Sequence, residues 1–355
     1  MTKKSLLLDT FNMKPTPIRP VTLHWWGVYK FQLAGVVSGP ADEDKGWRLS
    51  GPGLAGVDMH FYETYKPDCF HLSAGAWKDL PGDAERQRAS KELRPAVMEL
   101  ESKTAIDDYV KYTSPEADEY LYAGIFDHVR PIAEKYGDNV LILVNEGNPV
   151  CGVFENNGPA GDFQDALIAV VEHPENLGYL IYKLYEASLR RIEAIKTAGA
   201  HGYIGSETCV SCDILSPAAF RALVAPAMGM FYHRVNEMGM ESVVYFLGEI
   251  LPILDDIAAL GARALMIEEK KKNYSLDAVE IYHRLNGRMA LFGNVDSVMD
   301  LLYGSRDDVV RETARQCAGT GPGFIASCGS PLCYDTPAEN IRAFLDTARG
   351  GVALG

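Results

Sequence analysis

Short apolar runs recur along the chain and alternate with longer stretches of helical periodicity. The segment Val140–Val144 is apolar throughout, a pattern typical of a strand that is buried on both faces, as in a parallel sheet. The same reading predicts eight strands, which are Val21–Trp26, Cys69–Ser73, Asn139–Asn145, Gly202–Glu207, Ser242–Leu247, Ala264–Glu268, Met289–Asn294 and Gly323–Cys328.

The segments between these runs carry helix signals. Ser216 followed by Pro217 is an N-cap with proline at the first helical position, and it opens an amphipathic run to about Met238. Eight strands with helical spacers predict a (β/α)8 barrel, in which residues 1–355 form a single domain. A doubly wound sheet is the alternative, weakened because no Gly-x-Gly-x-x-Gly follows an early strand. The stretch from Phe31 to Pro67 is rich in Gly and Pro, and we expect it to be an excursion over the barrel mouth.

Polar and thiol side chains follow several predicted strands, at the end where such barrels carry their chemistry. They include Glu207, Glu249, Glu268, Asn294 and Cys328. Strands also end where solvent begins, so for any one residue this ordinary reading has equal weight. Carboxylates with a thiol suit a zinc ion that keeps an open coordination position. Aromatic residues gather at the first strand, and because side chains alternate, one of the two adjacent tryptophans should reach the mouth.

Composition narrows the functional class. The net charge is −14, which argues against nucleic acid as a partner, since phosphate backbones need clustered Lys and Arg. No run of 18 apolar residues predicts a membrane span. Seven thinly spread cysteines favour a reducing cytoplasm. Cys209 and Cys212 form a Cys-x-x-Cys pair, but no second pair completes a zinc knuckle, and acidic neighbours disfavour a thioredoxin-like role.

Three motifs in the C-terminal half resemble those of the uroporphyrinogen decarboxylase superfamily. They are Leu215–Phe220 with Pro226, Leu291–Asp296, and Gly323–Ile325 continuing to Thr336–Ile341. Together they cover about residues 195–345, whereas the N-terminal 190 residues match loosely. The resemblance implies a (β/α)8 barrel.

Two departures from the decarboxylase pattern separate this chain from the enzymes that give the superfamily its name. Those enzymes carry an arginine motif after the first strand, and Trp26–Gly35 has no arginine. Their histidine-containing C-terminal loop corresponds here to Ser327–Pro331. The sequence is more similar to the corrinoid-linked methyltransferases of the superfamily, and most similar to those that begin O-demethylation.

In that branch the resemblance implies a zinc site. Cys328 fits the thiolate ligand on the last strand, but the His-x-Cys of the fifth strand is Tyr245–Leu247 here. Glu249 is the nearest replacement, and Glu268 or Glu269 could complete the set.

We therefore expect an enzyme that moves a methyl group from a small methoxylated, aromatic donor to a corrinoid held by a separate partner protein, assisted by zinc. The expected zinc ligands are Cys328, Glu249 and Glu268, and Glu207 is the expected acid or supporting residue. Expected substrate-binding residues are Trp25, Trp26, Tyr29 and Asn294. The alternatives are a decarboxylase-like lyase, a methylcobamide:thiol methyltransferase, and a non-catalytic barrel that binds a corrinoid or tetrapyrrole. A cytoplasmic location and a possible homodimer complete these expectations.

Overall fold

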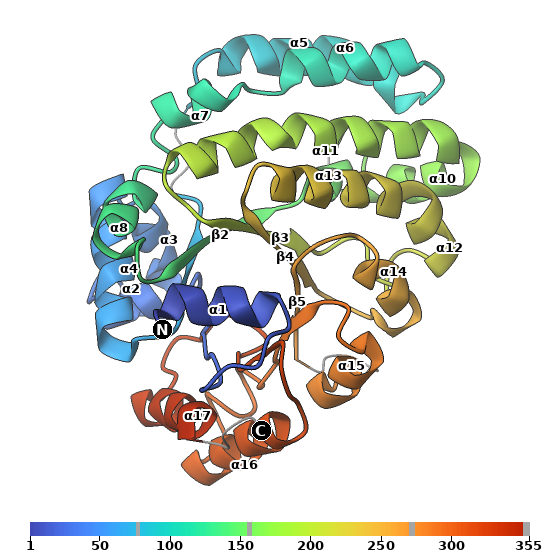
Figure 1. Ribbon diagram of the computed structural model, residues 1–355. Helices are drawn as coiled ribbons and strands as arrows, with labels where there is room; N and C mark the ends of the chain where they lie inside the picture. Colours follow the sequence, from blue (N-terminus) through green and yellow to red (C-terminus); the bar gives the residue numbers. More distant parts are fainter. Residues whose placement is uncertain (76–78, 155–157, 270–273, 351–355) are drawn as a thin grey trace.

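Seven parallel strands form one curled sheet at the centre of the described chain (Figure 1). The computed structural model describes residues 1–75, 79–154, 158–269 and 274–350. Neighbours in the sheet follow sequence order, and each pair is parallel. The strands are β1 Cys69–Ser73, β2 Leu141–Gly147, β3 Gly202–Glu207, β4 Glu241–Phe246, β5 Ala264–Ile267, β6 Ala290–Phe292 and β7 Phe324–Ile325. Seven of the eight predicted strands are thus confirmed, and the last two are shorter than predicted.

The first predicted strand, Val21–Trp26, is wrong as a strand and forms one isolated bridge to Ala326. The Val21 amide donates to the Asp68 carboxylate at 2.8 Å, and the His24 amide donates to Cys328 Sγ at 3.2 Å. Because side chains accept from these amides, a continuous ladder cannot form. Backbone bonds still reach both sides of the segment, from Thr22 N to Ala326 O and from Asp68 N to Val21 O.

Helices surround the sheet, and α5 with α6 forms an outer layer beyond α11 (Figure 1). In chain order they are α1 Lys3–Phe11, α2 Tyr29–Leu33, α3 Glu43–Trp47, α4 Gly51–Tyr65, α5 Asp83–Met98, α6 Lys103–Thr113, α7 Ala117–Tyr122, α8 Val129–Tyr136, α9 Pro149–Phe154, α10 Phe163–Glu172, α11 Pro174–Thr197, α12 Pro217–Ala219, α13 Ala225–Glu237, α14 Leu254–Ala258, α15 Ala278–Leu285, α16 Arg306–Ala318 and α17 Ala338–Gly350. Within the described ranges, no helix is both long and apolar enough to cross a bilayer.

The predicted helix from Ser216 is divided into two parts. The Ser216 hydroxyl accepts from Ala219 N at 3.1 Å, which confirms the predicted N-cap. A π-helical turn over Phe220–Val224 then separates α12 from α13. Pro226 lies in the first turn of α13 and lacks an amide to donate to the preceding turn, so it interrupts regular α-helical bonding there.

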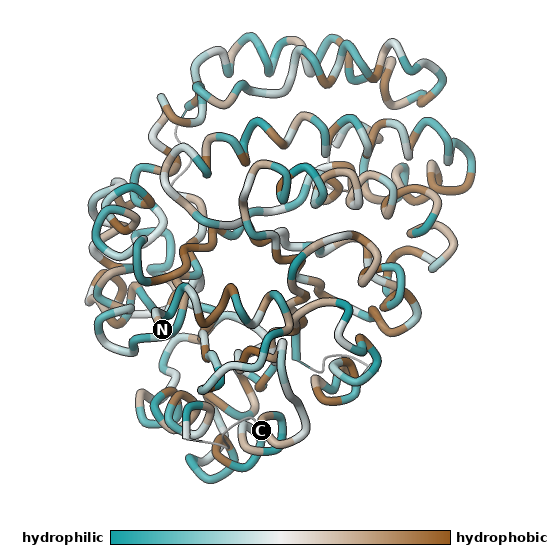
Figure 2. Tube along the Cα trace, viewed as in Figure 1, coloured by the Kyte–Doolittle hydropathy of each residue, from teal (hydrophilic) through white to brown (hydrophobic). Residues whose placement is uncertain are grey.

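Helix α1 closes the N-terminal end of the sheet, as Figure 1 shows. Its Leu7 and Phe11 pack into the interior cluster of inward-facing strand residues, and the rings of Phe11 and Phe292 lie 6.0 Å apart. The Lys4 amide donates to Asn139 O, just before β2. Apolar residues follow the strands and the inner faces of the helices (Figure 2). The interior is therefore filled from this end, and the carboxyl ends of the strands remain for chemistry.

Candidate active site

A pocket of about 470 Å³ lies at the carboxyl ends of β1 and β2. Residues from the segment between positions 31 and 67 form one wall, and strand-end residues form the other. The lining residues are Trp26, Asp44, Trp47, Arg48, Ser73, Ala74, Gly75, Asn145, Glu146 and Gly147. We call this cavity the Trp26 pocket. It joins two indole rings with carboxylate, amide and hydroxyl groups, a composition suited to an aromatic ligand that carries a few polar atoms.

Three polar side-chain atoms of the described pocket lining are buried without a hydrogen-bond partner. They are the donors Trp26 Nε1 and Ser73 Oγ and the acceptor Glu146 Oε1. Asn145 instead exchanges hydrogen bonds with Ser206 Oγ at 2.9 and 3.3 Å. A buried polar group that is left unsatisfied costs about 1–3 kcal/mol. A ligand oxygen that accepts from Trp26 Nε1 and Ser73 Oγ would recover this cost.

Two buried histidines each come two residues before a residue of the pocket lining. His24 precedes Trp26, and His71 precedes Ser73. Their rings are 4.8 Å apart, and the His24 ring is 5.0 Å from that of Tyr245. Burial holds the pKa of His71 well below its ordinary value, so this imidazole is neutral at pH 7. The sequence alone predicted no role for either histidine.

Of the three predicted aromatic substrate-binding residues, two lie in the core and one lines the pocket. Trp25 is fully buried, and its ring lies 4.8 Å from Phe61 and 5.6 Å from Phe70. Tyr29 is also buried, with its hydroxyl 2.6 Å from that of Tyr65. Both therefore lie in the core beneath α4, whereas Trp26 lines the pocket. Substrate contact by Trp25 and Tyr29 stays a prediction.

Glu207 is a fully buried carboxyl at the end of β3. Its oxygens accept from Tyr232 at 3.0 Å, from Tyr185 at 3.2 Å and from Asn148 Nδ2. Burial, with a smaller contribution from nearby Cys151, raises the pKa of Glu207 to about 8. A carboxyl group with this pKa can hold or release a proton near neutral pH.

The predicted zinc ligands each make local contacts. Cys328 is buried, accepts from the His24 amide, and has its pKa raised by burial to about 12. The Glu268 carboxylate accepts from Gly248 N at 2.6 Å and from Tyr274 at 2.7 Å. The Glu249 carboxylate accepts from the amide of Leu251, two residues further on.

These contacts do not assemble a zinc site in the described ranges. There, no three His, Cys, Asp or Glu side chains lie close enough together to hold a metal ion. Glu269 lies near Cys328. Its charge contributes to the raised pKa of the Cys328 thiol, and its backbone lies against Gly329, the residue after Cys328. Zinc binding by Cys328, Glu249 and Glu268 stays a prediction, and no chemical step is derived through it.

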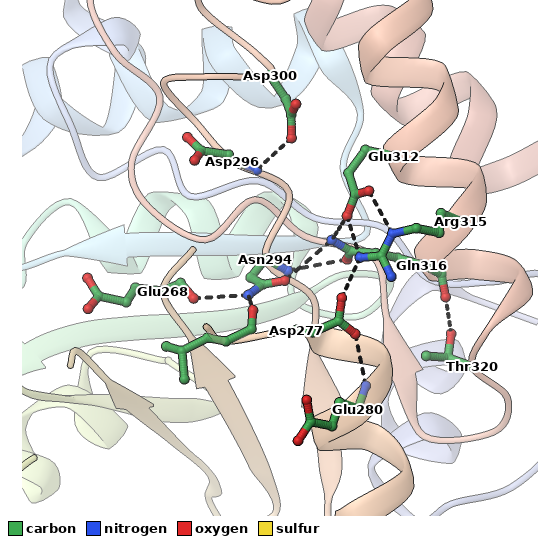
Figure 3. Close-up of polar contacts among 11 residues, drawn as sticks. Glu268, Asp277, Glu280, Asn294, Asp296, Asp300, Glu312, Arg315, Gln316 and Thr320 are labelled. Carbon is green, nitrogen blue, oxygen red and sulfur yellow. Dashed lines mark hydrogen bonds and ion pairs between the residues drawn. The ribbon is translucent and has the colours of Figure 1, made fainter. Parts of the chain in front are cut away.

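Asn294 lies in a polar network that fixes the ends of β5 and β6 (Figure 3). Its Nδ2 donates to Glu268 O at 3.0 Å and to Leu276 O at 2.6 Å, and its Oδ1 accepts from Gln316 at 3.3 Å. Gln316 in turn donates to Glu312 at 2.9 Å. Since backbone carbonyls use both amide hydrogens, Asn294 holds the chain at Glu268. Substrate binding by Asn294 stays a prediction.

Comparison with known proteins places the fold and the site in a family. Residues 91–351 match the family model of uroporphyrinogen decarboxylase (URO-D). This chain belongs to the uroporphyrinogen decarboxylase family. The resemblance in the C-terminal motifs is thereby confirmed.

Two curated relatives of this URO-D family member differ in chemistry. The methylcobamide:CoM methyltransferase MtaA of Methanosarcina barkeri is 30% identical over 161 residues, which cover 45% of this chain and 44% of that protein. The uroporphyrinogen decarboxylase of Anaeromyxobacter dehalogenans (strain 2CP-C) is 25% identical over 225 residues, covering 62% of each. The chain thus spans less than two thirds of the length of either relative.

A solved methyltransferase from Methanosarcina mazei shares the fold over 98% of both chains, with a TM-score of 0.75 at 22% identity. This likeness extends to the N-terminal part of the chain that precedes the match to the family model.

Proposed function

We propose that this URO-D family member is a corrinoid-dependent methyltransferase, and that its methyl donor is a small methoxylated aromatic compound bound in the Trp26 pocket. The observation that carries the proposal is the pocket itself, in which Trp26 and Trp47 flank hydrogen-bonding groups at the carboxyl ends of the strands. The MtaA relative supports corrinoid chemistry.

The charge of the pocket disfavours the decarboxylase alternative. Its charged lining residues are Asp44, Glu146 and Arg48. Arg48 pairs with Asp44 at 3.4 Å, and Glu146 pairs with Arg191 at 2.8 Å. The described lining thus carries one basic side chain against two carboxylates, and the net charge of −14 opposes a substrate with many carboxylates.

The pocket residues can stabilise the leaving group of such a reaction. A corrinoid on a partner protein would supply the acceptor for the methyl group. When the bond between methyl carbon and ether oxygen breaks, its electron pair stays on the oxygen as a phenolate. Trp26 Nε1 and Ser73 Oγ are donors that can face this developing charge, and preorganised donors of this kind lower the barrier. The indole rings hold the aromatic ring and exclude water.

Glu207 is proposed as the proton reservoir of the site. Asn148 donates to its carboxylate and directly follows Gly147, which lines the pocket. With a pKa of about 8, Glu207 is mostly protonated at pH 7 and can supply the proton that the phenolate finally needs.

A methylcobamide:thiol methyltransferase is the second candidate, favoured by the name of the MtaA relative. The two reactions run in opposite directions with respect to the corrinoid. The test is to mix the enzyme with a reduced corrinoid protein and a panel of methoxylated aromatics, and separately to mix it with a methylated corrinoid protein and a thiol. The cobalt absorption spectrum shows which mixture reacts.

A further inference from the structure

Two cysteines that are far apart in the sequence meet where α9 packs beside the end of β3. Cys151 lies in α9, and Cys209 lies two residues beyond β3. Both thiols lie beside the hydroxyl of Thr208, and the Cys209 thiol helps to raise the pKa of the Cys151 thiol. Thr208 Oγ1 lies between them, 2.6 Å from Cys151 Sγ and 3.6 Å from Cys209 Sγ. Neither cysteine is part of a disulfide, and both residues are partly exposed.

This pairing differs from the one that the sequence motif suggests. Cys-x-x-Cys would join Cys209 to Cys212. The backbone of Cys212 is instead held by Glu249, whose carbonyl accepts from the Cys212 amide at 2.8 Å. The nearby charges of Glu249 and Asp213 act on the Cys212 thiol. The structure thus adds Cys151, which shares the Thr208 hydroxyl with Cys209, to the cysteines of the motif.

We propose that Cys151 and Cys209 are a redox-active dithiol, which low-molecular-weight disulfides such as oxidised glutathione convert to an intramolecular disulfide. One cysteine loses its proton and attacks a sulfur of the reagent, and one glutathione thiolate leaves. The second cysteine then loses its proton and attacks the mixed disulfide, and the second glutathione leaves. Two thiols are oxidised, one glutathione disulfide is reduced to two thiols, and one Sγ–Sγ bond forms.

The cross-link joins α9 to the strand end that carries Glu207. The Cys151 amide donates to Asn148 Oδ1 at 2.8 Å, and Asn148 Nδ2 donates to the Glu207 carboxylate. A disulfide at Cys151 therefore fixes the helix whose first turn is anchored through Asn148. The oxidation state of the dithiol would set how freely this rim of the site moves.

The reaction has a definite pH dependence. The contact with the Cys209 thiol and burial both raise the pKa of the Cys151 thiol. The thiolate is the attacking species, so the dithiol reacts slowly at neutral pH and faster at alkaline pH. This separates it from a thioredoxin-like pair, whose attacking thiol has a lowered pKa.

The test is to incubate the full-length protein with oxidised glutathione, block the remaining thiols by alkylation, and map the linked peptides by mass spectrometry. We expect a Cys151–Cys209 peptide that forms faster at alkaline pH. Cys212→Ser is the matched control and should leave this linkage unchanged. Cys151→Ser should abolish it and leave glutathione attached at Cys209, and its circular dichroism should match that of the wild type.

Two results would overturn the proposal. One is a Cys209–Cys212 peptide as the main product in the wild type. The other is the absence of any linkage at Cys151 at alkaline pH while the thiols of the folded protein remain open to alkylation.

Discussion

Trp25 is buried in the core, whereas the adjacent Trp26 lines the pocket, and substitution of each residue should have a different effect. Trp26→Ala removes one wall of the pocket and a donor, so we expect the KM for the methyl donor to rise at least about tenfold, equivalent to ~1.4 kcal/mol of binding. Trp25→Ala removes a fully buried ring and should instead cost about 3–5 kcal/mol of stability. Thermal midpoints and donor KM values, measured for both variants, check the assignment. Normal donor affinity in Trp26→Ala would show that the wall is elsewhere.

The buried carboxyl of Glu207 makes stability depend on pH. Its pKa is raised to about 8 in the folded protein, from an ordinary value of 4.5. Between these two values the folded state holds a proton that the unfolded state has lost, so this contribution to stability decreases as pH rises.

Glu207→Gln removes this titration while keeping a similar shape. We expect the variant to gain stability relative to the wild type between pH 5 and pH 8, by on the order of 3 kcal/mol. Urea unfolding at both pH values measures the difference, with Glu249→Gln as the partly exposed control. Parallel pH dependences for Glu207→Gln and wild type would contradict the raised pKa.

At this scale the sequence identified residue types better than their directions. Glu207, Cys328 and Trp26 were found because they follow apolar runs. The face to which a side chain points depends on its exact position along the segment. The sequence alone therefore could not show which of Trp25 and Trp26 faces the core and which lines the pocket. The groups that donate hydrogen bonds to Glu207 come from α11, α13 and the loop after β2, and no local sequence pattern connects them.

Among the elements, the segment from α2 to α4 is held by an ion pair of an unusual kind. Lys30 Nζ and Asp58 Oδ1 lie 2.8 Å apart, and both side chains are fully buried. Such a pair is costly to break, since removing one partner leaves a buried charge without compensation, at about 3–5 kcal/mol. The pair joins α2 to α4 on the side of the molecule that carries Trp47, part of the pocket wall.

Lys30→Met and Asp58→Leu should therefore each destabilise the protein by about 3–5 kcal/mol, whereas the double variant that combines them should recover most of this loss. Denaturant unfolding of the two single variants and the double variant gives the coupling energy. If the losses of the two single variants simply add in the double variant, the pair does not act as a unit.

The strands were predicted well because strands buried on both faces produce solid apolar runs, as Val140–Val144 does. The first one was not, because its backbone bonds depend on distant side chains. Asp68 and Cys328 accept from the amides of Val21 and His24, and neither partner is visible in the local pattern. The helix after Ser216 is a similar case. The sequence predicted its N-cap but not its π-helical turn.

At the scale of the whole molecule, the family could be predicted because its motifs lie in contiguous segments between residues 195 and 345. The pocket could not, because its walls come from Trp26, from the segment that carries Trp47, and from two strand ends. Only the curled arrangement of the sheet brings these residues together. The zinc ligands were predicted from their positions in the sequence. Such positions do not show whether the side chains lie close enough together to hold a metal ion.

The most direct test follows cobalt in a single turnover. The enzyme is mixed with a reduced corrinoid protein and a methoxylated aromatic donor, with uroporphyrinogen tested in parallel for decarboxylation. We expect the cobalt spectrum to change to that of the methylated corrinoid only when enzyme and aromatic donor are both present, with a strongly slowed change in Trp26→Ala and no carbon dioxide from uroporphyrinogen. Decarboxylation of uroporphyrinogen, or transfer only from a methylated corrinoid to a thiol, would contradict the proposed function.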